Sequence, residues 1–442
     1  MKQYLFLPLF LGFGFLNLII GLFGARNVKN KDDYFLAGRS LGLLPVTLTL
    51  LATQIGGGML LGTAQEAYKI GFYGLMYAFG MVLGFIILSL GLAAKLRELR
   101  ISTTSEVFEL KYNSPMLNKV ASFFSAATLF GIVVGQVIAS RLLLYSLGIE
   151  NELILIIFWL FIIIYATVGG LKAVIFTDSF QVIFVTLVFI GIFLYVLYSE
   201  AGSFFSLPSI IEQQKLFAPM QINPYNTLII ILMPALFSLI GQDIAQRFFA
   251  AKNKYIATFA AIFATLFLII FSIIPIYFGI KAKALGLVGN PILQLVGQFT
   301  NEIVLIFASF GIIAAITSTG DSILVAISSN LAQPFNVKNK LKLARVITIV
   351  TGIAAFGFSY VLPQDTLHLI LESFEISVSC LLVPLLFGYF KDNLNKNAAL
   401  FSIAFGLSGF ILFRIYPITF PKEIASIALS LAGYFIGDKI KT

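Results

Sequence analysis

The stretch that decides the fold is Ala52-Thr53-Gln54-Ile55-Gly56-Gly57-Gly58, in the middle of an apolar run over residues 42–64. Three successive glycines each cost about 1 kcal/mol in a helix interior. In a bilayer, unpaired backbone groups cost more, so a broken helix persists only beside a cavity or inside protein. Close helix packing through small residues is the alternative interpretation. We expect a transmembrane helix that is interrupted at its glycines.

A matching interruption lies in Leu239-Ile240-Gly241-Gln242-Asp243, within the apolar run 227–250. The two breaks begin two successive groups of five apolar runs, 42–198 and 227–391. Paired broken helices at corresponding positions indicate an inverted-repeat secondary transporter, because an odd number of crossings turns the second group over. The carbonyls freed at such breaks can coordinate a cation, and half-helix N-termini can hold an anionic group.

The composition agrees with a polytopic helical membrane protein. Of the 442 residues, 59% are hydrophobic and 11% are charged, against about 25% charged in soluble domains. This excludes a soluble globular protein and a disordered chain. We expect thirteen spans, at residues 4–25, 42–64, 72–95, 118–147, 152–169, 173–198, 227–250, 255–280, 303–331, 343–363, 367–390, 397–415 and 422–438.

The basic residues predict the orientation in the cell membrane. With the N-terminus outside, 21 Lys and Arg residues, Arg247 among them, fall in cytoplasmic segments and seven outside. Cytoplasmic loops carry the excess of basic residues, so we expect the C-terminus inside. The net charge of +9 then indicates contact with anionic lipid rather than with nucleic acid. Residues 1–41 form an extra helix and a cytoplasmic connector, and residues 396–442 form two further helices; the oligomeric state stays open.

Few ionisable or amide side chains fall at membrane depth, where such groups usually mark a pathway. They are Arg141, Asp178, Asp243, Asp321, Glu372 and Glu375, with the amides Gln54, Gln136 and Gln242. The excess of acids favours a cation-binding cavity. For Asp178 and Arg141, a structural ion pair or a position at a helix end is an equal alternative. Ser318 and Thr319 add adjacent hydroxyls, which could instead bond back to their own helix.

Histidine and cysteine are almost absent. The single Cys380 excludes an intramolecular disulfide, and the single His368 excludes a multi-histidine metal site. We interpret His368 as a surface residue. The sequence holds no pair of a nucleophile and its base, so an enzyme is not expected. Proton coupling through Asp321 or Asp178, a carboxylate-only membrane enzyme and a sensor that keeps a transporter fold remain as alternatives.

Four ordered segments resemble the sodium:solute symporter family over nearly the whole chain. They are residues 33–41, 52–58, 169–181 and 318–322. The resemblance implies an all-α fold of leucine-transporter type with an inverted five-plus-five repeat, one extra N-terminal helix and about two C-terminal helices. It also implies coupling to sodium and a small-molecule solute.

The resemblance carries residue roles as well. It implies a sodium site formed by the carbonyls of Ala52, Ile55 and Ala315 and the hydroxyls of Ser318 and Thr319. Asp178 matches a family aspartate near a possible second sodium site, and Asp321 is a further possible ligand. The solute would lie between the two breaks, near Gln54, Gly57, Gln136, Gln242 and Asp243.

Within the family, residues 52–58 and the surroundings of Asp321 resemble the choline-transporter branch. Gln54 and Gly241 stand where that branch places tryptophans, and the only tryptophan is Trp159. Aromatic cages recognise quaternary ammonium groups. We therefore expect a different polar solute, held by amides and a carboxylate, such as an amino acid or another small organic metabolite.

Overall fold

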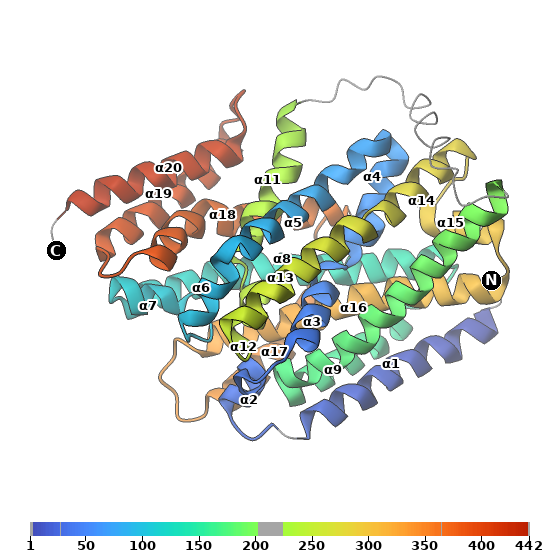
Figure 1. Cartoon of the computed structure of the whole chain (residues 1–442), viewed down its shortest axis with the longest axis horizontal. Coiled ribbons are helices and arrows are strands. Elements are labelled where there is room, and N and C mark those ends of the chain that lie inside the picture. The colour runs from blue at the N-terminus through green and yellow to red at the C-terminus, as the bar shows by residue number, and fades with distance from the viewer. Residues whose placement is uncertain (1–2, 27, 202–223, 364, 441–442) are drawn as a thin grey trace.

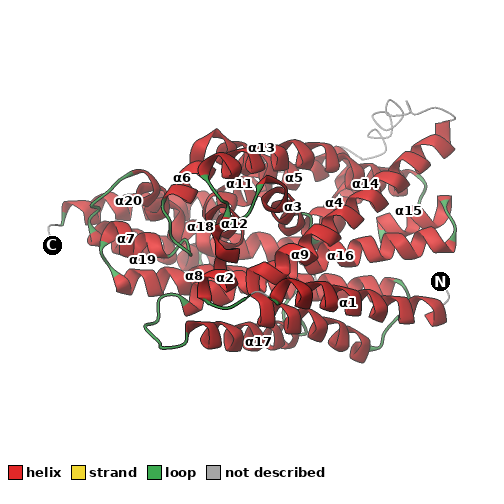
Figure 2. Ribbon diagram, turned by 60° about the horizontal axis from the view of Figure 1, so that its bottom comes forward, coloured by secondary structure: helices red, strands yellow, loops and turns green. Residues whose placement is uncertain are grey.

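The computed structural model describes residues 3–26, 28–201, 224–363 and 365–440, and these consist of helices joined by loops (Figure 2). In the first half the helices are α1 (Gln3–Ala25), α2 (Lys31–Leu36), α3 (Leu43–Gln54), α4 (Thr63–Ile70), α5 (Leu75–Ile87), α6 (Ala93–Glu98), α7 (Glu106–Tyr112), α8 (Pro115–Ser146) and α9 (Glu152–Ala201). In the second half they are α11 (Pro224–Ile240), α12 (Gln242–Ala250), α13 (Lys254–Phe271), α14 (Ile273–Ala284), α15 (Pro291–Phe299), α16 (Glu302–Ala332), α17 (Lys340–Phe358), α18 (Thr366–Phe390), α19 (Lys396–Ile415) and α20 (Lys422–Lys439).

Polar caps explain where many of these helices begin. The Asn301 side chain accepts a hydrogen bond from the Val304 amide at the start of α16, and Asp365 accepts one from the His368 amide at the start of α18. Ser114 and Asn253 cap α8 and α13 in the same way. Each cap satisfies an amide that the first helical turn leaves unpaired, which is stabilising by about 1 kcal/mol.

Both expected helix breaks are confirmed. Helix α3 ends at Gln54, Ile55 leaves the helical conformation (φ −83°, ψ 65°), and the chain resumes as a π-helical turn over Gly58–Gly62 before α4. Helix α11 ends at Ile240, and Gly241 is extended (φ −61°, ψ 126°) before α12 begins. Two pairs of short helices therefore replace two straight spans.

Helix α9 reverses direction at Gly170, where φ is 54° and ψ is −145°. The two parts of α9 lie against the same part of α1. The Phe10 ring stacks on Phe158 with centroids 4.4 Å apart, and the Phe13 ring lies 6.1 Å from Phe180. A straight helix would separate Phe158 from Phe180 by about 33 Å. Gly170 thus separates the expected spans 152–169 and 173–198.

Ten helices within the described residues are long and apolar enough to cross a membrane. One covers Glu152–Ser199 with its reversal, and another, Gly58–Glu98, includes both the end of the first broken helix and the next expected span. Helix α20 matches the expected span 422–438 but is not among the ten. Two short helices lie between the expected spans: α7 in the segment 98–117, here called the connector, and α15 between the spans 255–280 and 303–331. Residues 202–223, between the expected spans 173–198 and 227–250, lie outside the described residues.

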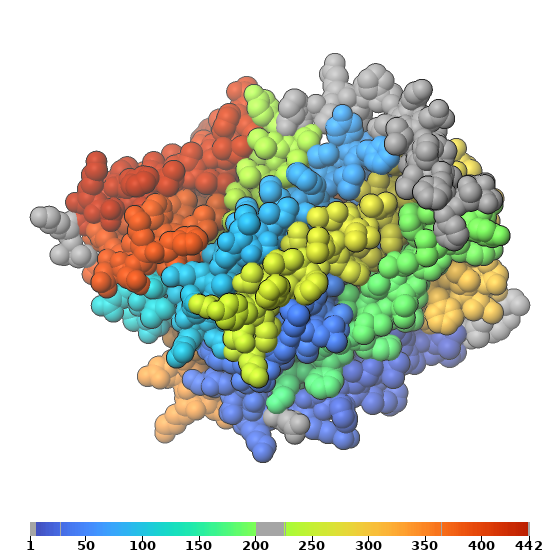
Figure 3. Space-filling view, viewed as in Figure 1, coloured from blue at the N-terminus to red at the C-terminus, as the bar shows by residue number. Residues whose placement is uncertain are grey.

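Helix α16 occupies the centre of the bundle, with α8, α9 and α3 packed around it (Figure 1). Nearly every side chain from Ala308 to Asn330 is buried, including its serines, threonines and Asp321. Helices α19 and α20 pack on each other at one end of the molecule, coloured orange and red in Figure 3. Polar residues of α16 are therefore enclosed by protein, where each requires a partner.

Replacement of Gly170 tests the reversal of α9. A Cβ there would lie 2.5 Å from the Tyr34 carbonyl oxygen, in a backbone conformation that L-residues rarely adopt. We expect Gly170→Ala to destabilise the protein by roughly 3 kcal/mol, measured as a lower Tm and yield in detergent. Gly191→Ala is the matched control, because Gly191 lies in the same helix with nothing within 4 Å. An unchanged Tm for Gly170→Ala would contradict the reversal of α9 at Gly170.

Candidate functional site

Oxygen atoms of α3 and α16 converge where α3 breaks. The Ser318 hydroxyl donates to the carbonyls of Ala52 (2.9 Å) and Ala315 (3.0 Å). The Thr319 hydroxyl lies 3.0 Å from the Thr53 carbonyl oxygen, 3.3 Å from that of Ala315 and 3.4 Å from that of Ala52. Backbone carbonyls and hydroxyls in such a cluster can replace the hydration shell of a small cation.

Gly56 is required for this approach of the two helices. A Cβ on Gly56 would lie 2.3 Å from the Thr319 hydroxyl oxygen. Ile55 is buried at the break, and its amide donates to the Leu51 carbonyl at 2.8 Å. Four of the five residues expected at the sodium site thus share hydrogen bonds, and Ile55 is the residue at which α3 leaves its helical path.

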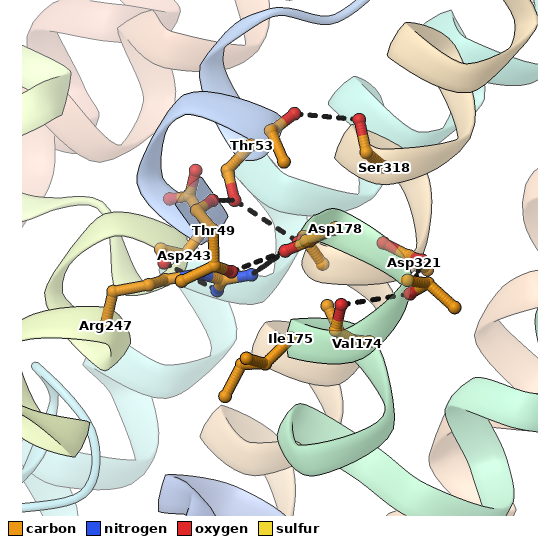
Figure 4. Close-up of polar contacts among 12 residues, drawn as sticks. Thr49, Thr53, Val174, Ile175, Asp178, Asp243, Arg247, Ser318 and Asp321 are labelled. Carbon is orange, nitrogen blue, oxygen red and sulfur yellow. Dashed lines mark hydrogen bonds and ion pairs between the residues drawn. The ribbon is translucent and has the colours of Figure 1, made fainter. Parts of the chain in front are cut away.

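A cluster of charged side chains lies about one helical turn of α16 beyond Ser318 and Thr319 (Figure 4). Asp178 of α9 accepts hydrogen bonds from the hydroxyls of Thr49 and Ser322, and its Oδ2 lies 3.8 Å from the Arg247 guanidinium. Arg247 also donates to the Ser322 hydroxyl and, at 2.7 Å, to the Asp243 carbonyl. The cluster joins α3, α9, α12 and α16 at one buried point.

Asp321 has different partners on the neighbouring face of α16. The hydroxyls of Tyr165 and Thr177 donate to its Oδ2, at 2.5 and 3.2 Å. Both donors belong to α9, on opposite sides of Gly170. Asp321 therefore ties α16 to the two parts of α9.

The sequence analysis placed Arg247 among the cytoplasmic charges, and the structure shows that this was wrong. The side chain is fully buried and surrounded by acidic residues. The available signal was the i, i+4 spacing of Asp243 and Arg247 inside an apolar run, since an acid and a base one turn apart face the same side of a helix. The sequence analysis also missed four hydroxyl side chains, because single hydroxyl residues in an apolar run carry no distinctive spacing: Thr49, Tyr165, Thr177 and Ser322.

A small cavity lies between the two broken helices. Its volume is about 40 Å³, below the roughly 300–1,000 Å³ of pockets that hold organic ligands of drug size. Its polar lining consists of Thr53, Gln54, Tyr77, Gln136, Ser238, Asp243 and Thr319, and the aromatic pair Phe237 and Phe374 stacks at one side with centroids 4.3 Å apart. In this conformation the protein closes around the cavity.

The residues expected to hold the solute separate into two groups. Gln54, Gln136 and Asp243 line the cavity, and the Gly57 amide donates to the Gln136 side-chain oxygen at 3.0 Å. Gln242 lies elsewhere: its side chain accepts from the Thr104 amide at 2.8 Å and donates to the Ser102 carbonyl at 3.1 Å. Gln242 therefore holds the 98–117 connector and does not face the cavity.

The remaining charges expected at membrane depth form ion pairs. Arg141 Nε lies 3.0 Å from Glu152, which agrees with the ion-pair interpretation. Glu375 is buried beside Arg414 (3.2 Å), which also lies 3.7 Å from Glu372. His368 is a surface residue, with 65% of its side chain exposed.

The buried Arg247 is tested by removing its charge. Arg247→Met leaves Asp178 without a cationic partner, and breaking a buried ion pair from one side costs about 3–5 kcal/mol. We expect a large fall in Tm in detergent, partly restored in the double variant Arg247→Met/Asp178→Asn. Lys254→Met is the control, because it breaks an exposed pair with Glu98 and should change Tm little. Equal Tm values for the single and double variants would contradict the pairing.

The family model described as "Sodium:solute symporter family" matches residues 34–406. The sodium/pantothenate symporter of Escherichia coli is 26% identical over 450 residues, covering 93% of this chain and 91% of the relative. The uncharacterized symporter YwcA of Bacillus subtilis is 24% identical over 444 residues, covering 92% of this chain and 86% of the relative.

Solved structures agree with the fold. A Na+-coupled sialic acid symporter in its substrate-bound outward-open state superimposes with a TM-score of 0.79 at 19% identity, covering 99% of this chain and 96% of that one. The family match spans most of the chain, including both broken helices and α16. The chain therefore belongs to the sodium:solute symporter family and is a sodium-coupled symporter in a multi-pass membrane fold.

Proposed function

We propose that this protein imports a small polar organic solute together with sodium by alternating access. The observation that carries the proposal is the contact of the α3 break with Ser318 and Thr319, which gathers hydroxyl and carbonyl oxygens from two helices beside a cavity. A cation bound there would join the broken helix to the centre of the bundle. The membrane potential would add about 2.3 kcal/mol per charge per 100 mV to uptake.

The sodium ligands in this proposal are the carbonyls of Ala52, Ile55 and Ala315 and the hydroxyls of Ser318 and Thr319. The solute would contact Gln54, Gly57, Gln136 and Asp243, whereas Gln242 supports the connector. The contacts of Asp178 with Arg247 and of Asp321 with Tyr165 favour a structural role over a second sodium site. We assign one sodium site on this basis.

The proposed architecture has thirteen crossings. Residues 42–198 and 227–391 form the two inverted five-helix repeats, flanked by residues 1–41 and 396–442. Support comes from the reversal at Gly170, the paired breaks at α3/α4 and α11/α12, and the length of α20. The distribution of basic residues supports an outside N-terminus and an inside C-terminus.

Alternating access requires that the cavity open to one side at a time. On the side of α4 and the start of α18, a second cavity of about 510 Å³ is lined by Glu66, Asp365 and Glu375, among others. On the other side, hydrogen bonds join Leu41 to Ala250 and Lys252, and Gln246 to Phe35. These contacts must break for the solute to leave toward the cytoplasm.

Proton coupling through Asp321 or Asp178 is the alternative within transport. Uptake driven by a pH gradient in the absence of sodium would support it. The family consists of symporters of sodium and a solute, so this alternative is not favoured, and neither is a membrane-embedded enzyme.

The sodium site is tested with Ser318→Ala/Thr319→Ala. Loss of two oxygen ligands should weaken the apparent affinity for sodium at least tenfold, about 1.4 kcal/mol, measured by the sodium dependence of Tm in potassium-balanced buffer. Ser408→Ala is the control, because Ser408 lies on the exposed face of α19 and bonds only within that helix. If the sodium dependence of Tm is unchanged in the double variant, Ser318 and Thr319 are not sodium ligands.

The orientation is tested by labelling introduced cysteines in intact cells with a membrane-impermeant maleimide. We expect Val288→Cys to react from outside and Lys338→Cys to react only after the membrane is permeabilised. Both positions are exposed, whereas Cys380 is buried and gives a low background. The reverse labelling pattern would invert the assigned topology.

A further inference from the structure

The cavity between the broken helices carries one acidic side chain and, among the described residues that line it, neither lysine, arginine nor histidine. Asp243 is 3% exposed, and its Oδ1 has no hydrogen-bond partner in the described part of the chain. A buried carboxylate oxygen without a partner is costly, since burial removes its water. A ligand that donates hydrogen bonds and carries positive charge would satisfy it.

The Arg247 guanidinium attracts the Asp243 carboxylate from a distance, but Arg247 does not line the cavity and forms no hydrogen bond with that carboxylate in the described part of the chain. Arg247 donates to the backbone carbonyl of Asp243 and to the Ser322 hydroxyl of α16. Its guanidinium also points toward Asp178 of α9 (Figure 4). Asp243 itself lies in the first turn of α12, where a negative side chain already complements the helix dipole. The half-helix N-terminus is thus less able to hold an anionic group of a solute.

The second cavity, beside α4 and the start of α18 and here called the outer cavity, also favours positively charged ligands. Five carboxylates line it, from Glu66, Asp365, Glu372, Glu375 and Glu423, with Lys422 and His368. Lys69 and Arg414 pair with carboxylates at its edge. Five acids against three permanent cations leave an acidic entrance, which raises the local concentration of cations.

The two cavities adjoin along α11 and α18. Met233 and Leu371 line the outer cavity, whereas Phe237 and Phe374, within one turn of them, line the inner one. The rings of Phe237 and Phe374 stack on each other where the two cavities adjoin. A protonated amine that passes this stack would meet aromatic faces before Asp243, and such faces attract cations.

We propose that the solute carries a protonated primary or secondary amine, which pairs with Asp243, while the amides of Gln54 and Gln136 bind its other polar groups. This inference rests on the proposed function, because it names the solute class of the same site. It disfavours solutes whose only charge is negative. Pantothenate, named for the Escherichia coli relative, is such an anion.

The test measures sodium-dependent Tm shifts of the purified full-length protein with matched probes. The amine probes are propylamine, L-alanine and L-proline; the others are propionate, N-acetyl-L-alanine, pantothenate and iodide. A ligand that binds the native state raises Tm by mass action. We expect a shift with at least one amine probe, and at least tenfold weaker apparent affinity for its counterpart without the amine.

Asp243→Asn should weaken the amine-dependent shift at least tenfold, whereas Asp243→Glu should keep part of it. Asp392→Asn is the control, because Asp392 forms an exposed pair with Lys111. The shift given by sodium alone, together with a monodisperse elution profile, reports whether Asp243→Asn is folded with its sodium site intact. If it does not fold, the amine preference of the unmodified protein decides the question.

Two outcomes would overturn the inference: no shift with any of the amines, whether or not pantothenate, propionate or iodide gives one, or unchanged amine affinity in Asp243→Asn. These results are distinct from failure of the proposed function, in which Tm and ligand binding would not depend on sodium at all.

Discussion

The contact between the α3 break and α16 is the constraint on which the rest of the structure depends. Thr319 reaches the carbonyls of residues 52 and 53 only because Gly56 has no side chain. The contact gives the freed backbone oxygens of α3 hydroxyl partners in a region without water. In the proposed function a sodium ion would use the same oxygens, so helix packing and ion binding would share one set of atoms.

The charged cluster extends this junction to the other helices of the core. Asp178, Arg247 and Ser322 connect α9, α12 and α16, and Thr49 adds α3. Asp178 and Arg247 each contact partners on other helices, and these contacts fix the helices relative to one another. The second broken helix is thereby fixed next to the first, with the cavity between them.

Much of the fold was predictable because a membrane limits the options for a chain. Long apolar runs predicted most of the spans, three glycines predicted the first break, a glycine beside polar residues predicted the second, and resemblance predicted the family. The short helices α7 and α15 between the expected spans were not predicted, because each is too short to give a clear apolar period. Arg247 was wrongly assigned to a cytoplasmic segment, because a charged residue near the end of an apolar run is usually interpreted as part of a loop.

The sequence by itself determined that the chain crosses a membrane, where two helices break, and which hydroxyls and acids are available at membrane depth. These follow from hydropathy and glycine content, which are local properties. Only the tertiary structure decided which acids are paired. It joined Asp178 to Arg247 and Asp321 to Tyr165, turned Gln242 toward the connector, and left Asp243 facing the cavity. Pairing depends on distances between helices far apart in sequence, and those distances are set by packing.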